Sequence, residues 1–103
     1  MSKKERRVIK MVLKKIARWL DGDSGRFSDG TKFRLANVRA PEKHQFGGSK
    51  ATKVASGMTS RSNGFVNWKP VGSSYGRQVG VMSNKDGSIN KRLQNRGYKN
   101  KGR

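Results

Sequence analysis

Several features are missing from this chain of 103 residues, and each absence excludes a class of protein or site. There is no cysteine, which excludes disulfide bonds, thiolate metal sites and a cysteine nucleophile. No apolar run comes near the roughly 20 residues that a membrane-spanning helix needs. Lys14, Lys15 and Arg18 interrupt the first apolar segment, which therefore does not fit the apolar centre of a cleaved signal peptide. We expect a cytoplasmic protein without a transmembrane segment.

Acidic residues are scarce, and this scarcity points to the partner. The sequence has 25 Lys plus Arg but only 6 Asp plus Glu, which gives a formal net charge of +19. Such a charge attracts polyanions, and the attraction weakens as the salt concentration rises. Nucleic acid, either DNA or RNA, is the expected partner. An anionic membrane surface is the alternative, because residues 11–20 form a basic amphipathic stretch.

Large apolar residues are also few, which limits the core that the chain can build. Four Leu, three Ile, eight Val and four Phe fall just below the level at which a highly charged chain is expected to be disordered. We expect one domain over residues 16–98 with a thin core, a basic N-terminal arm or helix over residues 1–15, and a basic C-terminal tail over residues 99–103. The arm residues expected to contact nucleic acid are Lys3, Lys4, Arg6 and Arg7.

Turn residues divide the middle of the chain into short strands and two helices. Ser28-Asp29-Gly30 indicates a tight hairpin turn. The spacing of apolar and turn residues predicts strands over residues 31–38, 65–68 and 75–82, and helices over residues 50–58 and 89–96. This order predicts a mainly β protein with short helices (α+β), built as a small five-stranded barrel of the OB type. That barrel is a common scaffold for binding nucleic acid.

Three of the six acids stand where they could take part in chemistry. Asp29 and Asp86 each precede a glycine in a turn, and turn formation explains both. Asp21 and Asp23 instead flank a glycine within one turn, and Glu42 stands at a predicted strand end. Carboxylates in such places can hold a hard divalent cation and orient an attacking water. Turn chemistry and ion pairing within a basic protein explain the same three residues equally well.

Three motifs, in order along the chain, resemble those of a known family. The first joins Leu20-Asp21-Gly22-Asp23-Ser24 to the stretch Asp29–Glu42, which reads DGTKFRLANVRAPE. The second is Ser74-Tyr75-Gly76-Arg77, and the third covers residues 86–93. Together they resemble the staphylococcal nuclease (thermonuclease-like) family across residues 16–98.

The resemblance implies a role for each matching residue. Asp23 would bind a divalent cation, calcium in most of the family with magnesium or manganese as alternatives, and Asp21 would support the metal site. Glu42 would orient or deprotonate the water that attacks phosphorus, while Arg34 and Arg77 would bind the phosphate and stabilise its developing charge. The further residues expected to contact nucleic acid are Arg39, Lys50, Lys53, Tyr75 (in the nucleotide pocket) and Tyr98 (by stacking on a base).

One position departs from the family pattern. Two residues before the proline, where the family usually has a second metal-binding Asp, this chain has Arg39. Charges about 4 Å apart interact by roughly 4 kcal/mol at an effective dielectric of about 20, so a guanidinium here would repel a cation. Three outcomes are open: the metal keeps fewer protein ligands, Arg39 itself supplies positive charge, or the protein binds nucleic acid without cleaving it. We expect a nuclease that cleaves DNA, RNA or both with low sequence specificity; the alternative is a non-catalytic nucleic-acid-binding protein on the same fold.

Overall fold

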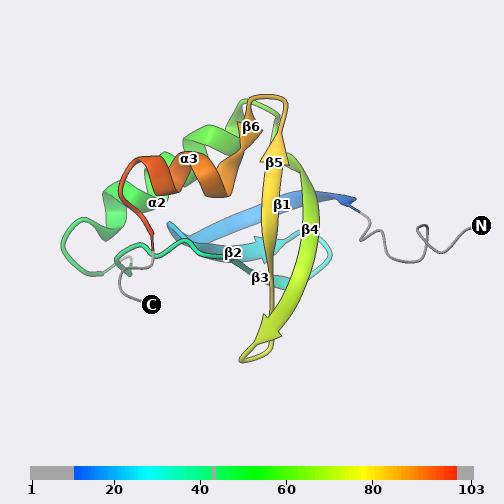
Figure 1. Cartoon of the computed structure of the whole chain (residues 1–103), viewed down its shortest axis with the longest axis horizontal. Helices are drawn as coiled ribbons and strands as arrows, with labels where there is room; N and C mark the ends of the chain where they lie inside the picture. The colour runs from blue at the N-terminus through cyan, green and yellow to red at the C-terminus, as the bar shows by residue number, and fades with distance from the viewer. Residues whose placement is uncertain (1–10, 43, 100–103) are drawn as a thin grey trace, which may run out of the picture.

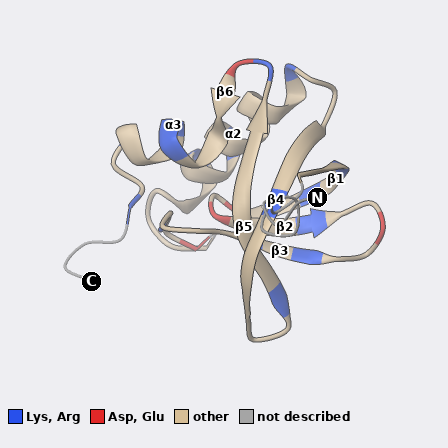
Figure 2. Ribbon diagram, turned by 45° about the vertical axis from the view of Figure 1, so that its right-hand side comes forward, with Lys and Arg blue, Asp and Glu red and all other residues tan. Residues whose placement is uncertain are grey.

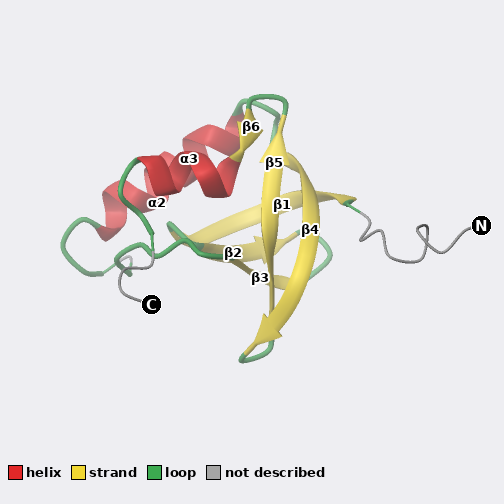
Figure 3. Cartoon of the chain, in the orientation of Figure 1, coloured by secondary structure: helices red, strands yellow, loops and turns green. Residues whose placement is uncertain are grey.

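The computed structural model describes residues 11–42 and 44–99 (Figure 1). Along the chain the elements are β1 (Val12–Asp21), β2 (Ser24–Phe27), β3 (Lys32–Leu35), α2 (Gly48–Ser60), β4 (Phe65–Ser74), β5 (Arg77–Asn84), β6 (Gly87–Ser88) and α3 (Ile89–Asn95). Figure 3 shows the two helices together on one side of the strands. The prediction of a mainly β protein with two short helices is confirmed. In the described ranges, no helix is both long and apolar enough to cross a membrane.

The strands form one mostly antiparallel sheet in the order β3-β2-β1-β4-β5-β6. β3 also pairs with β5, in parallel, so that each of the first five strands has at least two neighbours. The sheet has one strand more than predicted, because the two residues of β6 pair with the end of β5. The parallel pairing matters for the site, because it brings β3 beside β5, which is more than 40 residues later in the chain.

The core is built around aromatic rings, which explains how so few aliphatic residues suffice. Phe27 stacks on Phe33 with the ring centroids 4.5 Å apart. Trp68 meets Phe27 edge-on, and Trp19 meets Phe33 edge-on, each at 5.1 Å. Aromatic side chains bury a large apolar area each. The indole N–H of Trp19 also donates a hydrogen bond of 3.0 Å to the hydroxyl of Thr59, which ties β1 to α2.

Features of the local sequence explain both helices. Ala51, Ala55 and Met58 form the buried face of α2, at helical spacing. At the start of α3, the side chain of Ser88 accepts a backbone hydrogen bond from the first turn. Gly97 follows this helix with φ of 98°, a conformation that favours glycine and that ends the helix.

A buried asparagine joins α3 to the sheet. The side-chain amide of Asn90 donates to the carbonyl oxygens of Ala36 (2.9 Å) and Gly80 (3.1 Å), and its oxygen accepts from the N–H of Met82 (2.8 Å). The residue is only 4% exposed. One side chain therefore satisfies three backbone groups, and it holds the end of β3 beside β5.

The predicted N-terminal arm is partly wrong, because strand β1 begins at Val12. Residues 12–15 pair antiparallel with β4, from Val12 opposite Trp68 to Lys15 opposite Phe65. The helix alternative rested on the near-helical spacing of Val8, Ile9, Val12, Leu13 and Ile16, but long-range pairing with β4 overrides that local pattern from Val12 onward. Residues 1–10, which contain the four predicted contacts Lys3, Lys4, Arg6 and Arg7, lie outside the described residues.

Three strand limits also differ from the prediction. β3 ends at Leu35, because the chain turns at Asn37 with φ of 58°. β4 continues to Ser74, and an irregularity between Pro70 and Gly72 lets the pairing with β5 pass the proline. β5 begins only at Arg77, since the two preceding residues form the turn of the hairpin.

Replacing Asn90 by Ala should destabilise the protein strongly. Met82 N–H and the Ala36 carbonyl would lose their side-chain partner, and each buried group left unsatisfied costs about 1–3 kcal/mol. Urea unfolding should therefore show a free energy of unfolding lower by at least about 2 kcal/mol. Asn95→Ala, at an exposed position of the same helix, is the control and should stay within about 0.5 kcal/mol of the wild type. Equal effects of the two substitutions would contradict the role given to Asn90.

Candidate active site

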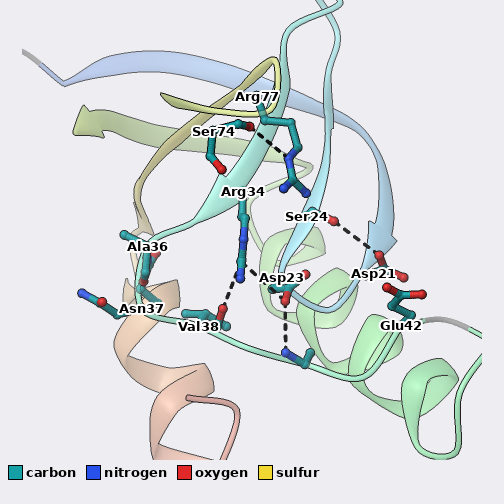
Figure 4. Close-up of polar contacts among 12 residues, drawn as sticks. Asp21, Asp23, Ser24, Arg34, Ala36, Asn37, Val38, Glu42, Ser74 and Arg77 are labelled. Carbon is teal, nitrogen blue, oxygen red and sulfur yellow. Dashed lines mark hydrogen bonds and ion pairs between the residues drawn. The ribbon is translucent and has the colours of Figure 1, made fainter. Parts of the chain in front are cut away.

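An open cleft of about 1000 Å³ lies where four segments of the chain meet. They are the β1–β2 turn, β3 with the loop that follows it, the tip of the β4–β5 hairpin, and the residues after α3. All five residues to which the family resemblance gives a chemical role line it: Asp21, Asp23, Arg34, Glu42 and Arg77. The predicted nucleic-acid contacts Arg39, Tyr75 and Tyr98 line it as well. Figure 4 shows the polar contacts among the central residues.

The β1–β2 turn is held against the rest of the molecule by a glycine. A Cβ atom added at Gly22 would lie 2.8 Å from the Cβ of Ala51 on α2 and 2.9 Å from the Cβ of Ala40. Only a residue without a side chain lets the turn approach this closely. Beside it, Asp23 Oδ2 accepts a hydrogen bond of 3.1 Å from the N–H of Ala40. The Asp-Gly-Asp sequence therefore fixes the position of both carboxylates.

Arg34 is held between a carboxylate and a backbone carbonyl. Its Nη1 atom lies 3.6 Å from Asp23 Oδ2 and donates a hydrogen bond of 3.2 Å to the carbonyl oxygen of Val38. This is possible because the chain turns back after β3, at Asn37, and passes beneath the arginine (Figure 4). The guanidinium is about a quarter exposed, so it reaches the cleft with a defined orientation.

Burial raises the pKa of Asp23 above its ordinary value of 3.8. The Ala40 N–H and the Arg34 guanidinium act in the opposite direction, and the neighbouring Asp21 raises the pKa further. The ion pair with Arg34 does not reverse the shift, because at 3.6 Å it is loose and the loss of hydration outweighs it. A carboxylate in this state gains from any cation that approaches it.

Arg77 and Tyr75 come from the tip of the β4–β5 hairpin. Tyr75 has φ of 51° and Gly76 has φ of 79°, as a two-residue turn between antiparallel strands requires. Such a φ is rare for a bulky side chain. Tyr75 is nevertheless 95% exposed, so the core gains nothing from the ring. Arg77 Nε lies 3.5 Å from the carbonyl oxygen of Ser74, which turns the guanidinium toward the cleft (Figure 4).

Glu42 stands on the rim of the cleft and is well hydrated. Its side chain is 63% exposed, with His44 Nε2 at 3.4 Å from Oε1. Its backbone is fixed by Gln45, whose side-chain oxygen accepts from the N–H of Glu42 at 2.7 Å and whose own N–H donates to the Glu42 carbonyl at 2.8 Å. The carboxylate is thus free to reach toward a bound water while its backbone stays in place.

Arg39 stands on the same wall, and its N–H donates to the carbonyl oxygen of Tyr98 at 3.3 Å. Tyr98, the last residue of the predicted domain, belongs to this wall and packs against the core. Lys99 follows it, so the cleft holds three carboxylates, three guanidinium groups and one ammonium group. Lys50 and Lys53 are on α2 and do not line the cleft, so their contact with nucleic acid stays a prediction.

Several groups of the cleft were missed by the sequence analysis. Ser24, whose hydroxyl lies 3.5 Å from Asp21 Oδ2, belongs to the quoted motif and could have been found there. Gln45 and Lys99 carry no pattern that marks them. The Val38 carbonyl and the Ala40 N–H are backbone groups, which no side-chain motif can indicate.

Asp21 and Asp23 are the carboxylates of the cleft that the resemblance assigns to a divalent cation. Over residues 11–42 and 44–99, no group of three or more His, Asp or Glu side chains is placed to hold a metal ion. Asp21 and Asp23 alone fall well short of the six to eight oxygens that calcium takes. Magnesium is bound in many enzymes by one or two carboxylates together with phosphate oxygens of the substrate, and the pair fits that arrangement.

Comparison with known proteins adds no assignment. No protein-family model matches the chain, and no curated protein matches it either.

The raised pKa of Asp23 predicts an unusual response to its replacement by Asn. A carboxyl group whose pKa is raised by folding adds stability that is fully present below the ordinary value of 3.8. This stability is lost as the pH rises through the pKa of the folded state. Asn stays neutral, and its oxygen can still accept from Ala40. In the presence of a chelator, D23N should therefore gain stability relative to the wild type between pH ~3 and ~7, measured by urea unfolding.

Asp86→Asn is the matched control with the opposite sign. The hydrogen bond from Arg61 lowers the pKa of Asp86, so this carboxylate stabilises the fold above pH 3.8 and D86N should lose stability relative to the wild type as the pH rises. If D23N followed the same course as D86N, the pairing with Arg34 would outweigh burial and the account of Asp23 would be wrong.

Tyr75→Asn should stabilise the protein and remove the ring that is predicted to stack on a base of nucleic acid. Asn tolerates positive φ better than tyrosine, so the free energy of unfolding should rise by up to about 1 kcal/mol. Loss of one stacked base should weaken binding by about 1–3 kcal/mol. Thermal unfolding and a titration with a labelled oligonucleotide measure the two effects. Tyr75→Phe keeps the ring and should change neither; unchanged binding in Y75N would exclude stacking by Tyr75.

Proposed function

We propose that this protein is a nuclease that hydrolyses phosphodiester bonds of DNA, RNA or both with low sequence specificity. The observation that carries the proposal is the convergence of Asp21, Asp23, Arg34, Glu42 and Arg77 on one cleft. The five residues come from four segments of the chain: the β1–β2 turn, β3, the loop that follows β3, and the β4–β5 hairpin. The net charge of +19 supports a polyanionic substrate, and contacts to the phosphate backbone carry no sequence information, which supports low specificity.

The fold supports the same proposal. The pairings link the strands in the cyclic order β1-β2-β3-β5-β4, and β4 returns to β1. We infer from this order a small five-stranded barrel of the OB type, a scaffold whose strand 2–3 face and hairpin loops bind oligonucleotides in other proteins. The cleft lies at that face and at the β4–β5 hairpin, where such proteins hold their ligands.

In the proposed mechanism, Arg34 and Arg77 hold the scissile phosphate and neutralise the negative charge that builds on its oxygens. Glu42, hydrated on the rim, orients a water molecule and accepts its proton as the water oxygen attacks phosphorus. The bond between phosphorus and the leaving oxygen then breaks, and that oxygen takes up a proton from solvent. The Asp23–Arg34 contact positions the arginine during this step.

A divalent cation is part of the proposal. Asp21 and Asp23 would hold it together with phosphate oxygens of the substrate, and it would lower the barrier by neutralising charge on the phosphate. Calcium is the cation that the family resemblance implies, but the small donor set favours magnesium or manganese. Arg39, on the same wall, competes with a cation and can supply part of the positive charge.

The test is cleavage of labelled single-stranded DNA, double-stranded DNA and RNA by the wild type and by Glu42→Gln, in magnesium, manganese, calcium and chelator. Loss of a general base lowers kcat by about 10²–10⁴-fold, and binding should remain close to that of the wild type. Asp29→Asn, which removes a carboxylate outside the cleft, is the control for contaminating nucleases and for charge, and should cleave normally. Equal cleavage by the wild type and Glu42→Gln would refute the proposal.

The second candidate function is binding without catalysis, and the position of Arg39 favours it. A guanidinium on the wall beside Asp23 and Arg34 can bind phosphate while keeping a cation out. This candidate predicts salt-sensitive binding with no cleavage in any cation. The variant Arg39→Asp then separates the two: new cleavage in magnesium would show that Arg39 alone silences the site, whereas cleavage by the wild type removes this candidate.

A further inference from the structure

Three cations stand in a row across the first three strands, outside the cleft. Arg18 of β1 is directly opposite Arg26 of β2, and Arg26 is directly opposite Lys32 of β3. Residues that are opposite each other in an antiparallel pair point to the same face. All three are exposed, while their neighbours Trp19, Phe27 and Phe33 point into the core. Figure 2 shows blue segments on β2 and β3 near the turn that joins these strands.

This row costs stability in the free protein. Neighbouring strands lie about 5 Å apart, and like charges directly opposite each other are destabilising. None of the three forms an ion pair within the part of the chain that the structure describes. Asp29, in the turn between β2 and β3, does not offset the charge of these three residues, because it pairs with Lys14. A row of this kind is suited to binding an anion.

The row continues into the cleft. Arg34 is two residues from Lys32 on β3 and opposite Ser24 on β2, and Ser24 is in turn opposite Asp21. Asp21, Ser24 and Arg34 thus form the next row of opposed residues after Arg18, Arg26 and Lys32. The two rows are roughly 7 Å apart along the strands. A strand of nucleic acid whose phosphate lies at Arg34 can place its next phosphates over Lys32, Arg26 and Arg18.

We propose that Arg18, Arg26 and Lys32 form a phosphate-binding track that holds the nucleic-acid strand beyond the cleft. The inference rests on nucleic acid being the ligand of the proposed function, but it does not need cleavage. Charge complementarity and continuity with the cleft identify the occupant as the backbone of one strand. The track contacts no base, so it strengthens binding equally for all sequences.

The test compares Arg26→Gln/Lys32→Gln with the matched pair Lys85→Gln/Lys91→Gln, two exposed cations at the β5–β6 turn and on α3. In a Glu42→Gln background, which keeps the strand uncut, binding to an oligonucleotide of about 12 nucleotides is titrated over a series of salt concentrations. Loss of two phosphate contacts should weaken binding about tenfold and reduce the slope of log K against log salt by roughly 1.4. Lys85→Gln/Lys91→Gln should change the affinity and the salt slope by less than half of these amounts.

Two further readouts separate the track from a general charge effect and from the proposed function. Without nucleic acid and at low salt, R26Q/K32Q should melt higher than the wild type, because the opposed charges are gone. With Glu42 intact, KM should rise on the long oligonucleotide but not on a dinucleotide, while kcat stays unchanged. If neither the wild type nor any variant cleaves, the nuclease proposal fails. The binding titration alone then tests the phosphate-binding track.

Equal losses in the two pairs of variants would overturn the proposal. So would weaker binding to vesicles of anionic lipid in R26Q/K32Q with unchanged binding to the oligonucleotide, because the row would then serve a membrane surface.

Discussion

The parallel pairing of β3 with β5 is the constraint on which the site depends. It sets Phe33 beside Gln78 and Arg34 beside Val79, and so brings the two phosphate-binding candidates Arg34 and Arg77 to one cleft. Gly80, the partner of Leu35 in this pairing, also lies so close to β4 that a Cβ atom there would be 2.5 Å from the carbonyl oxygen of Lys69. Because the partners are far apart in the sequence, this pairing carries a large cost in loop-closure entropy.

The cleft is then fixed by backbone groups rather than by side chains alone. After β3 the chain turns back at Asn37, so that the Val38 carbonyl receives Arg34 and the Ala40 N–H reaches Asp23. The carbonyl of Ala36 just before this turn is held by Asn90. Asn90 and Arg34 thus hold the backbone on either side of the turn at Asn37, through the carbonyl oxygens of Ala36 and Val38.

The motif predicted which residues would meet, but it could not predict what holds them. The residues 21–24, 34–42 and 74–77 pointed to the cleft because their spacing matched a family pattern. The start of strand β1 was not predicted, because the apolar residues over 8–16 have near-helical spacing, whereas residues 12–15 are extended and pair with β4. The row of Arg18, Arg26 and Lys32 could not be predicted either, because only the register across three strands makes these residues neighbours.

The few acids separate into two groups by their electrostatics, and the separation argues for a site. Lys14 holds the pKa of Asp29 well below its usual range, and Arg61 lowers that of Asp86, so these two turn carboxylates stabilise the fold. Burial raises the pKa of Asp23 instead, even though the protein carries an excess of cations that could neutralise it. A chain with so thin a core tolerates a destabilised carboxylate and an unpaired row of cations when a ligand that binds only the folded state offsets both. The proposed nucleic-acid ligand would meet this condition for the row of cations, and a cation bound with it beside Asp23 would meet it for the carboxylate.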